Sequence, residues 1–317
     1  MRLRRVATTG IKTKPKSVGS VPLTGQNKAG HNRLAIIGWP CFYNEIMKTF
    51  VRTLLLFLFL SIGCQVMADN LKEGTRLFEA EKYRAAMSYL IKPDAQTDPE
   101  AMNMIGFMYN RGLGIQKNPE EAYKWYRKAA EAGLAVSQFN VGLMYQYGRG
   151  VQKNIPEAVK WFRKAAEQNH ASAELKMGYL TVKGIGVKRD YREAMKWYRR
   201  AAEHGDDKGY VNIGILYARG RGVKKDPNRA VQYYIMGAQK GEPDAQALLG
   251  TSYVLGKGIP QDNEKALFWY KKAAKNGSIE AMKELGYIYE TGRLGVKKDL
   301  GEAERWNAMA KKAEEQE

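Results

Sequence analysis

The sequence repeats itself with a period of 36 residues, and this period constrains the fold more than any other feature. A glycine marks it six times, at Gly106, Gly142, Gly178, Gly214, Gly250 and Gly286. An aromatic residue follows in phase, at Trp125, Trp161, Trp197, Tyr233, Trp269 and Trp306. The last aromatic is one residue late, because the pair Gly256/Gly258 becomes Gly292/Gly295 through an insertion. A fixed period of about 20–50 residues is typical of stacked structural units rather than of one globular core.

Residues 173–208 show what one unit contains. Ala173, Met177 and Leu180 have helical spacing, and Gly184 suits the left-handed position just past a helix end. Asp190 with Glu193 predicts a capping box, in which the aspartate caps the next helix and the glutamate reaches back to the backbone. The same pair recurs as Asn118/Glu121, Asn154/Glu157 and Asp299/Glu302, whereas Asp226 and Asp262 keep only the cap.

The second helix of the unit has one apolar face. Ala194, Trp197, Tyr198 and Ala201 are spaced so that all four lie on that face, and Gly205 ends the helix. Each unit is therefore predicted to be a two-helix hairpin. A single hairpin cannot bury its apolar stripe alone, so its stability depends on its neighbours.

The pattern resembles the Sel1-like repeat, a relative of the tetratricopeptide repeat. The likeness is carried, for example, by Ser137-Gln-Phe-Asn-Val-Gly142, Tyr145, Gly148-Arg-Gly-Val151, Ala158, Trp161-Phe162 and Lys164-Ala-Ala166. It implies an all-α fold, a right-handed α/α solenoid of stacked two-helix units. We expect six units, at residues 101–136, 137–172, 173–208, 209–244, 245–280 and 281–317, after a degenerate capping hairpin at 69–100. Thr181 departs from the pattern, since it replaces a tyrosine found in the other five units.

The chain changes character before residue 69. Met47, Lys48 and Arg52 precede an uncharged apolar run that ends near Gly63, and Ala68 closes a stretch of small residues. This arrangement predicts a signal peptide at residues 47–68, with an apolar run too short to span a bilayer. We therefore expect export to the periplasm or beyond, after cleavage near Ala68. Residues 1–46 are interpreted as a non-native or disordered basic extension, with a nucleic-acid-binding arm as the alternative.

Cys64 allows a second outcome at this signal. Leu60-Ser-Ile-Gly-Cys64 approaches the motif that precedes a lipidated cysteine in bacterial lipoproteins, although its leucine lies one residue too far away. A lipid anchor at Cys64 is therefore the alternative to cleavage after Ala68. Cys41 and Cys64 are the only cysteines, so a chain cut after Ala68 contains no disulfide and no thiolate site.

Composition also limits the chemistry that we expect. Ten of the 52 basic and one of the 33 acidic residues precede residue 69, so the remainder has a net charge of +10. Basic residues recur on the second helices, either as a solvated face or as a column for an acidic partner. We expect no nucleic-acid partner for an exported chain. His170 and His204 lie near helix ends, where capping or exposure accounts for them. We predict no catalytic residues, no metal site and no cofactor.

A partner is expected on the concave side, which the first helices of such solenoids line. The first, fifth, eighth and ninth positions of each unit face the core, and the third, seventh and tenth face away. Several middle units are apolar on that second face, which indicates either packing between neighbouring first helices or a groove for a peptide. The candidate groove residues are Phe107, Phe139, Leu143, Gln146, Leu175, Tyr179, Val211, Ile215, Lys283 and Tyr287.

These observations favour an interaction protein over an enzyme. The resemblance implies a scaffold or adaptor of the bacterial envelope that binds a protein or peptide partner. A regulator that holds a partner's domain in check differs only in how the partner responds. The alternative from a different class is a cell-wall or β-lactam-related hydrolase or binding protein, an activity linked to some cysteine-rich members of the family.

Overall fold

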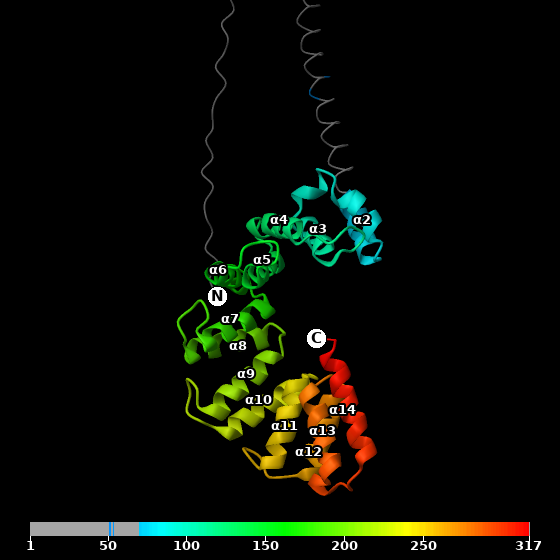
Figure 1. The fold of residues 1–317 in the computed structure, drawn as a ribbon. Helices are drawn as coiled ribbons and strands as arrows, with labels where there is room; N and C mark the ends of the chain where they lie inside the picture. Colours follow the sequence, from blue (N-terminus) through cyan, green and yellow to red (C-terminus); the bar gives the residue numbers. More distant parts are fainter. Residues whose placement is uncertain (1–50, 52, 54–69, 317) are drawn as a thin grey trace, which may run out of the picture. The chain divides into compact units, whose positions relative to one another are not determined.

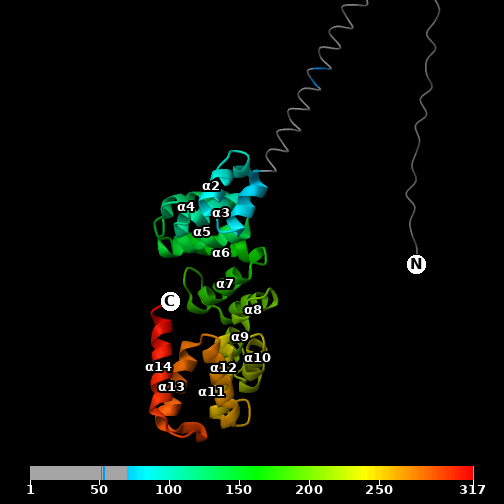
Figure 2. The same cartoon turned by 90° about the vertical axis from the view of Figure 1, so that its right-hand side faces the viewer.

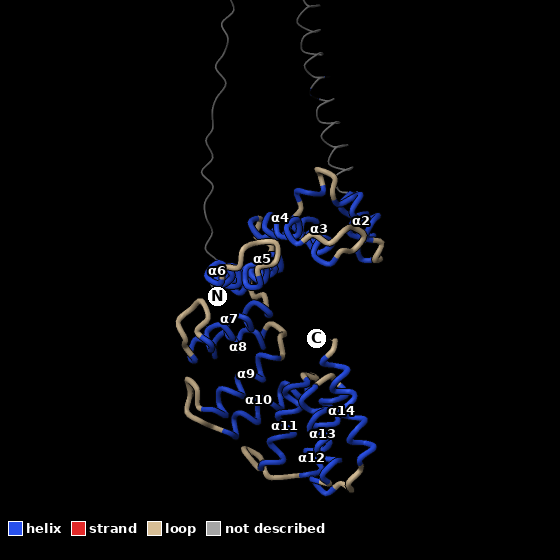
Figure 3. The backbone as a smooth tube through the Cα atoms, in the orientation of Figure 1, coloured by secondary structure: helices blue, strands red, loops and turns tan. Residues whose placement is uncertain are grey.

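A computed structural model describes residues 51, 53 and 70–316, and no strand occurs among them (Figures 1 and 3). The predicted signal peptide and basic extension lie outside this part, apart from Val51 and Thr53. A helix at residues 70–79 comes first. Then follow α2 (Tyr83–Leu90), η1 (Ala95–Thr97), α3 (Pro99–Arg111), α4 (Pro119–Glu131), α5 (Ala135–Tyr147), α6 (Ile155–Glu167), α7 (Ala171–Lys183), α8 (Tyr191–Glu203), α9 (Lys208–Arg219), α10 (Pro227–Gln239), α11 (Pro243–Leu255), α12 (Asn263–Lys275), α13 (Ile279–Thr291), η2 (Arg293–Gly295) and α14 (Leu300–Glu314).

The helices pair as hairpins that stack in chain order. The odd-numbered helices α3 to α13 are the first helices of the units, and the even-numbered helices α4 to α14 are the second helices. Each first helix packs on its own second helix, and each second helix packs on the first helix of the next unit. Figures 1 and 2 show this succession from two directions. The fold is thus the α-solenoid that the 36-residue period predicts.

The predicted N-caps are confirmed, but the glutamate half of the capping box is wrong. The Asp190 side chain accepts from the Arg192 and Glu193 amides, and the same cap begins α4, α6, α10, α12 and α14. The Asp190 amide, however, donates to the Thr181 carbonyl at 3.1 Å. The glutamate therefore finds no free backbone donor, and Glu193 pairs with Lys196 at 3.0 Å instead.

The two glycines of each loop have different tasks. Gly148 ends α5 with φ 68°, a left-handed conformation that other residues adopt only with strain. Gly150 also has a positive φ, and a Cβ there would lie 2.0 Å from the Pro119 carbonyl oxygen. The second glycine therefore lets the loop rest on the start of the preceding unit's second helix. The repeated glycine pair is both a helix stop and a contact between units.

The core continues from unit to unit instead of closing around one centre. At the predicted core positions Val141 and Met144 are buried, as are their equivalents in the other units. Trp161 of α6 reaches back into a cluster with Tyr126 and Ala130 of α4. Trp197 of α8 likewise joins a cluster with Ala158 and Phe162 of α6, and Trp125 of α4 joins one that includes residues of α2. The aromatic marker of the sequence is therefore an inter-unit contact.

The helix at residues 70–79 packs on α2. A Cβ at Gly74 would lie 2.7 Å from the Leu90 side chain, and Leu77 shares a buried cluster with Leu90 and α3. Within the described residues, no helix is long and apolar enough to cross a membrane.

Candidate functional site

The first helices present a polar and aromatic face away from the core, which we call the first-helix face. It consists of the third, seventh and tenth positions of each unit. Tyr179 and Tyr287 are its most exposed large hydrophobic residues, at 45% and 47%. Phe107, Phe139 and Leu143 are half-buried. This face therefore offers apolar surface that the core does not cover.

Three candidate residues meet in one pocket of about 450 Å³. We call it the aromatic pocket. Phe139 contributes from α5, and Leu175 and Tyr179 contribute from α7. Ser172, Lys176, Tyr198, Asp206, Lys208 and Asn212 complete the lining. The lining thus combines apolar and aromatic side chains with polar and charged ones, as in many peptide and ligand sites.

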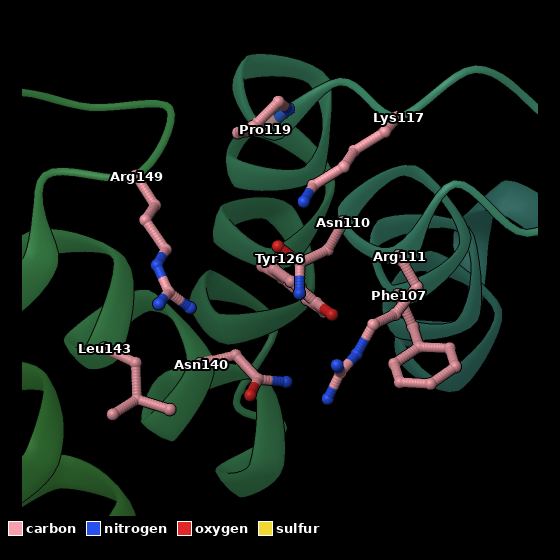
Figure 4. Close-up of a pocket in the computed structure, with 9 residues that line it drawn as sticks. All are labelled: Phe107, Asn110, Arg111, Lys117, Pro119, Tyr126, Asn140, Leu143 and Arg149. Carbon is pink, nitrogen blue, oxygen red and sulfur yellow. The ribbon is translucent and has the colours of Figure 1, made fainter. Parts of the chain in front are cut away.

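Two other candidates, Phe107 and Leu143, line a larger pocket of about 650 Å³ (Figure 4). We call it the basic pocket, because Arg111, Lys117 and Arg149 line it together with Asn110, Pro119, Tyr126 and Asn140. In Figure 4 the three basic side chains come from different sides and their charged ends point toward the space around Tyr126 and Asn140. The pocket lies between the first two units.

The basic side chains of this pocket have no acidic partner. Among the described residues no carboxylate lies within ion-pair distance of Arg111, Lys117 or Arg149. Arg111 lies over the Phe107 ring, with 5.9 Å from its guanidinium carbon to the ring centroid. Burial raises the pKa of the Tyr126 hydroxyl, and the charge of Arg111 opposes this with a smaller effect. The hydroxyl therefore stays protonated and can donate.

The local sequence explains how these groups converge. Gly112 ends α3 in a left-handed conformation, so the chain turns back and brings Lys117 near the end of the same helix. The close contact of Gly150 with Pro119 holds the loop that carries Arg149 against the start of α4. Both glycines belong to the 36-residue pattern. The pocket is thus a regular feature of the junction between units.

The remaining candidate groove residues lie outside both pockets. Val211 is only 5% exposed and belongs to the core, against which Ile215 also packs. Gln146 keeps a buried side-chain oxygen without a partner among the described residues. Lys283 pairs with Glu314 at 2.5 Å, and Tyr287 packs beneath Arg293. The partner-binding hypothesis therefore concentrates on the first three units.

Sequence reasoning missed Arg111, Lys117 and Arg149. All three lie at a helix end or in a loop, where the search for a helix face did not look. The available signal was positional: several basic residues of the second helices have a glutamate or an aromatic residue one turn away in the same helix, whereas Arg111, Lys117 and Arg149 have no acidic residue at that spacing in a helix of their own. Lys124 and Lys160, for example, pair with Glu121 and Glu157 at 2.6 and 2.5 Å. Lys128 and Lys164 each lie 4.3 Å from the centroid of the tryptophan one turn earlier. The solvated-face interpretation of the second helices accounts for these contacts.

The two histidines have structural partners. His170 is the N-cap of α7, where its Nδ1 accepts from the Ala173 amide at 3.2 Å, so its predicted capping use is confirmed. His204 lies 2.8 Å from a carboxylate oxygen of Glu174. Within the described chain, no group of three or more His, Cys, Asp and Glu side chains is arranged to hold a metal ion.

A sequence model of the Sel1 repeat matches six consecutive segments: residues 99–134, 135–170, 171–206, 208–242, 243–278 and 279–313. The chain belongs to the Sel1 repeat family. The matched units begin one or two residues before those inferred from the glycine period, and so coincide with the observed helix starts. Proteins of this family generally act as non-catalytic scaffolds for protein–protein interaction.

Two solved Sel1 structures are similar to this chain. A Sel1 repeat protein from Oxalobacter formigenes is 57% identical, with a TM-score of 0.74, over 76% of this chain and 96% of that one. A protective antigen of uropathogenic Escherichia coli strains, which displays the same repeat fold, is 30% identical with a TM-score of 0.59. That match covers 78% of this chain and 61% of the antigen. No curated protein gives a match. The fold class predicted from the sequence is confirmed.

Proposed function

We propose that this Sel1 repeat protein is an exported scaffold of the bacterial envelope that binds a peptide or protein segment on its first-helix face. The aromatic pocket is the observation that carries the proposal. Phe139, Leu175 and Tyr179 lie together there, although the sequence separates Phe139 from Tyr179 by more than one unit. Aromatic side chains of this kind supply most of the binding energy in protein interfaces.

The surroundings of the pocket fit a peptide better than a buried small molecule. Tyr179 is largely exposed, and Lys176 and Lys208 stand at the rim. An open apolar centre with charged edges excludes water from the middle of an interface while polar groups fix the direction of the segment. Phe107 and Leu143 continue the first-helix face toward the first unit, so a segment can extend along it.

Export is the second part of the proposal, and it rests on the signal-peptide pattern of residues 47–68. Cell fractionation with intact-mass measurement of the native protein tests it. A periplasmic or secreted chain that begins at Asp69 supports cleavage after Ala68. A membrane-bound chain that begins at a lipid-modified Cys64 supports the anchored form. A cytoplasmic chain that retains residues 47–68 contradicts export.

Site-specific photocrosslinking tests the binding surface. A photoreactive phenylalanine analogue replaces Tyr179 in the native host, and a matched protein carries it at Phe268, which is 57% exposed on the second helix α12. We expect a discrete crosslinked protein from position 179 that is absent from position 268. Replacing Leu175 by Asp in the same chain should remove the crosslink. Equal crosslinking from both positions, or none from position 179, contradicts a partner on this face.

A further inference from the structure

We propose that the basic pocket binds the carboxylates of an acidic, partly apolar peptide segment. This inference rests on the proposed function, because it specifies the chemistry of the partner that the first-helix face binds. It is carried by Arg111, Lys117 and Arg149, which lie in one pocket without any carboxylate to neutralise them in the described structure. Three cations that face one another across a pocket repel, and an anionic ligand relieves that repulsion.

Three cations without an ion pair among the described residues are gathered in this one pocket. On the second helices, Lys124, Lys160 and Lys196 each pair with a glutamate one turn earlier. Arg149 instead lies over the exposed Tyr147 ring, at 5.1 Å from its guanidinium carbon to the ring centroid. This contact leaves the guanidinium N–H groups free to donate in the plane of the group. A guanidinium with free donors suits a carboxylate, which accepts two parallel hydrogen bonds.

The equivalent junction three units later shows which features come from the fold. A pocket of about 360 Å³ there contains Pro227, Tyr234, Lys225 and Lys257, which correspond to Pro119, Tyr126, Lys117 and Arg149. The amides of the first junction are replaced, since Ala218 and Leu248 stand where Asn110 and Asn140 do. The recess is thus common to the solenoid. The two asparagines beside the cations are present at the first junction and absent from this later one.

The size and walls of the basic pocket favour a peptide over a small inorganic anion. A volume of about 650 Å³ lies within the range of sites that bind ligands much larger than a single anionic group. Phe107, Leu143 and the buried Tyr126 ring form apolar walls beside the charges. An aspartate or glutamate next to an apolar side chain matches both parts of this lining. The Tyr126 hydroxyl and the two asparagine amides offer further donors to the carboxylate.

The position of the basic pocket relative to the aromatic pocket determines where the apolar and the acidic residues lie along the ligand. Helix α5 separates the two: Phe139 lines the aromatic pocket, and the next residue, Asn140, lines the basic pocket. One segment that crosses α5 reaches both. We therefore expect an apolar side chain in the aromatic pocket and acidic residues a short distance along the same segment.

Selection from a random dodecapeptide library displayed on phage tests this inference without a known partner. The library is selected on three proteins: wild type, the double variant Arg111→Gln/Arg149→Gln, and the double variant Lys225→Gln/Lys257→Gln. The two variants lose the same charge, and their four side chains are exposed, so both should fold. The Lys225/Lys257 variant is the matched control because it changes the equivalent junction.

We expect wild type and the Lys225/Lys257 variant to enrich peptides with acidic residues beside an apolar one. The Arg111/Arg149 variant should lose this preference, and an enriched peptide should bind it about tenfold more weakly than wild type. The same peptide with glutamine and asparagine in place of its acids should bind all three proteins alike.

The outcomes separate this inference from the proposed function. Enrichment of peptides without acidic residues overturns the acidic ligand but leaves the first-helix face as a binding surface. Equal loss of acidic preference in both double variants shows a general effect of charge and also overturns it. If no peptide is enriched on wild type, the inference fails, and the photocrosslink at position 179 then decides alone whether the scaffold proposal stands.

Discussion

The ring of Tyr198 rests directly on the backbone of Gly178. A Cβ built at Gly178 would lie 2.5 Å from the Tyr198 Cε1 atom. The period-marking glycines of the other units make the same contact with Tyr126, Phe162, Tyr234 and Tyr270, and the inserted residue of the last unit brings Asn307 to this position instead. The 36-residue marker is therefore the point of closest approach between the two helices of a hairpin.

Replacing Gly178 by Ala should destabilise the protein, although alanine is the better helix former. The added methyl group must displace the buried Tyr198 ring, which we expect to cost about 1–3 kcal/mol of unfolding free energy. Chemical denaturation measures it. Gly301→Ala is the control, because this helical glycine of α14 has only the Asp299 carboxylate near its Cβ position, at 3.4 Å. That variant should be neutral or stabilised by up to about 1 kcal/mol. Equal effects of the two substitutions would contradict the close approach.

The tryptophans should couple one unit to the next. Trp161 is 9% exposed and packs among Ala122, Tyr126 and Met144 of the neighbouring helices. We expect Trp161→Ala to cost about 3–5 kcal/mol and to broaden the unfolding transition, because the units on either side then unfold less cooperatively. Phe268→Ala, on an exposed aromatic, should change stability by no more than about 0.5 kcal/mol. A narrow transition with an unchanged midpoint in Trp161→Ala would show that the coupling lies elsewhere.

The repeated part of the structure could be read from the sequence because each unit obeys the same local rules. The spacing of Ala173, Met177 and Leu180 identified a buried face, and Gly184 and Asp190 identified where one helix ends and the next begins. The prediction for the glutamate of the capping box was wrong, for a reason that the sequence around the helix start does not contain. Its expected partner, the cap amide, donates to a carbonyl of the preceding helix.

The candidate site was predictable only in part. Phe139, Leu175 and Tyr179 were found because they share a helix face that periodicity defines. Arg111, Lys117 and Arg149 come together through two loops and a contact between units, and no pattern within one unit brings them to the same place. Val211 shows the opposite error: the helical wheel places it on the outer face, although it lies in a buried cluster with residues of the units before and after its own. Contacts between units decide these positions, and a single-unit pattern does not contain them.

In the third unit, a buried carboxylate of α7 links this helix to the end of α8. Glu174 is fully buried, with one oxygen 2.8 Å from the Arg200 Nε atom and the other 2.8 Å from the His204 Nδ1 atom. Other units place glutamine here: Gln138 bonds to Gln168 and Gln246 bonds to Asn276, each 30 residues further on. Glu174 and His204 occupy the equivalent positions in the third unit.

Removing Arg200 should therefore cost far more than replacing Glu174 and His204 together. Arg200→Leu leaves the Glu174 carboxylate buried with only His204, and we expect a loss of about 3–5 kcal/mol. The variant Glu174→Gln/His204→Asn reproduces the link of Gln246 with Asn276 and should stay within about 1 kcal/mol of wild type. When Arg200→Leu is added to the Glu174→Gln/His204→Asn variant, the further loss of unfolding free energy measures the other contacts of Arg200. These contacts are with the Ala166 carbonyl and the Trp197 ring. An equal cost of Arg200→Leu in both backgrounds would show that the buried charge is unimportant.

His170 should make stability depend on pH near neutrality. Burial lowers the pKa of this histidine below its ordinary value of 6.5, and the neutral ring caps α7 by accepting from the Ala173 amide. Above pH 6.5 the ring is neutral in both folded and unfolded chains, so the cap contributes fully; as the pH falls below 6.5, the unfolded chain takes up the proton first. The free energy of unfolding then falls progressively until the pH has passed below the lowered pKa of His170 in the folded chain. Thermal unfolding of wild type and His170→Ser from pH 8 down to about pH 5 checks this, because Ser278 caps α13 in the same way without titrating. The difference between the two midpoints should shift in favour of the serine variant on acidification, and a constant difference would show that His170 does not titrate in its cap.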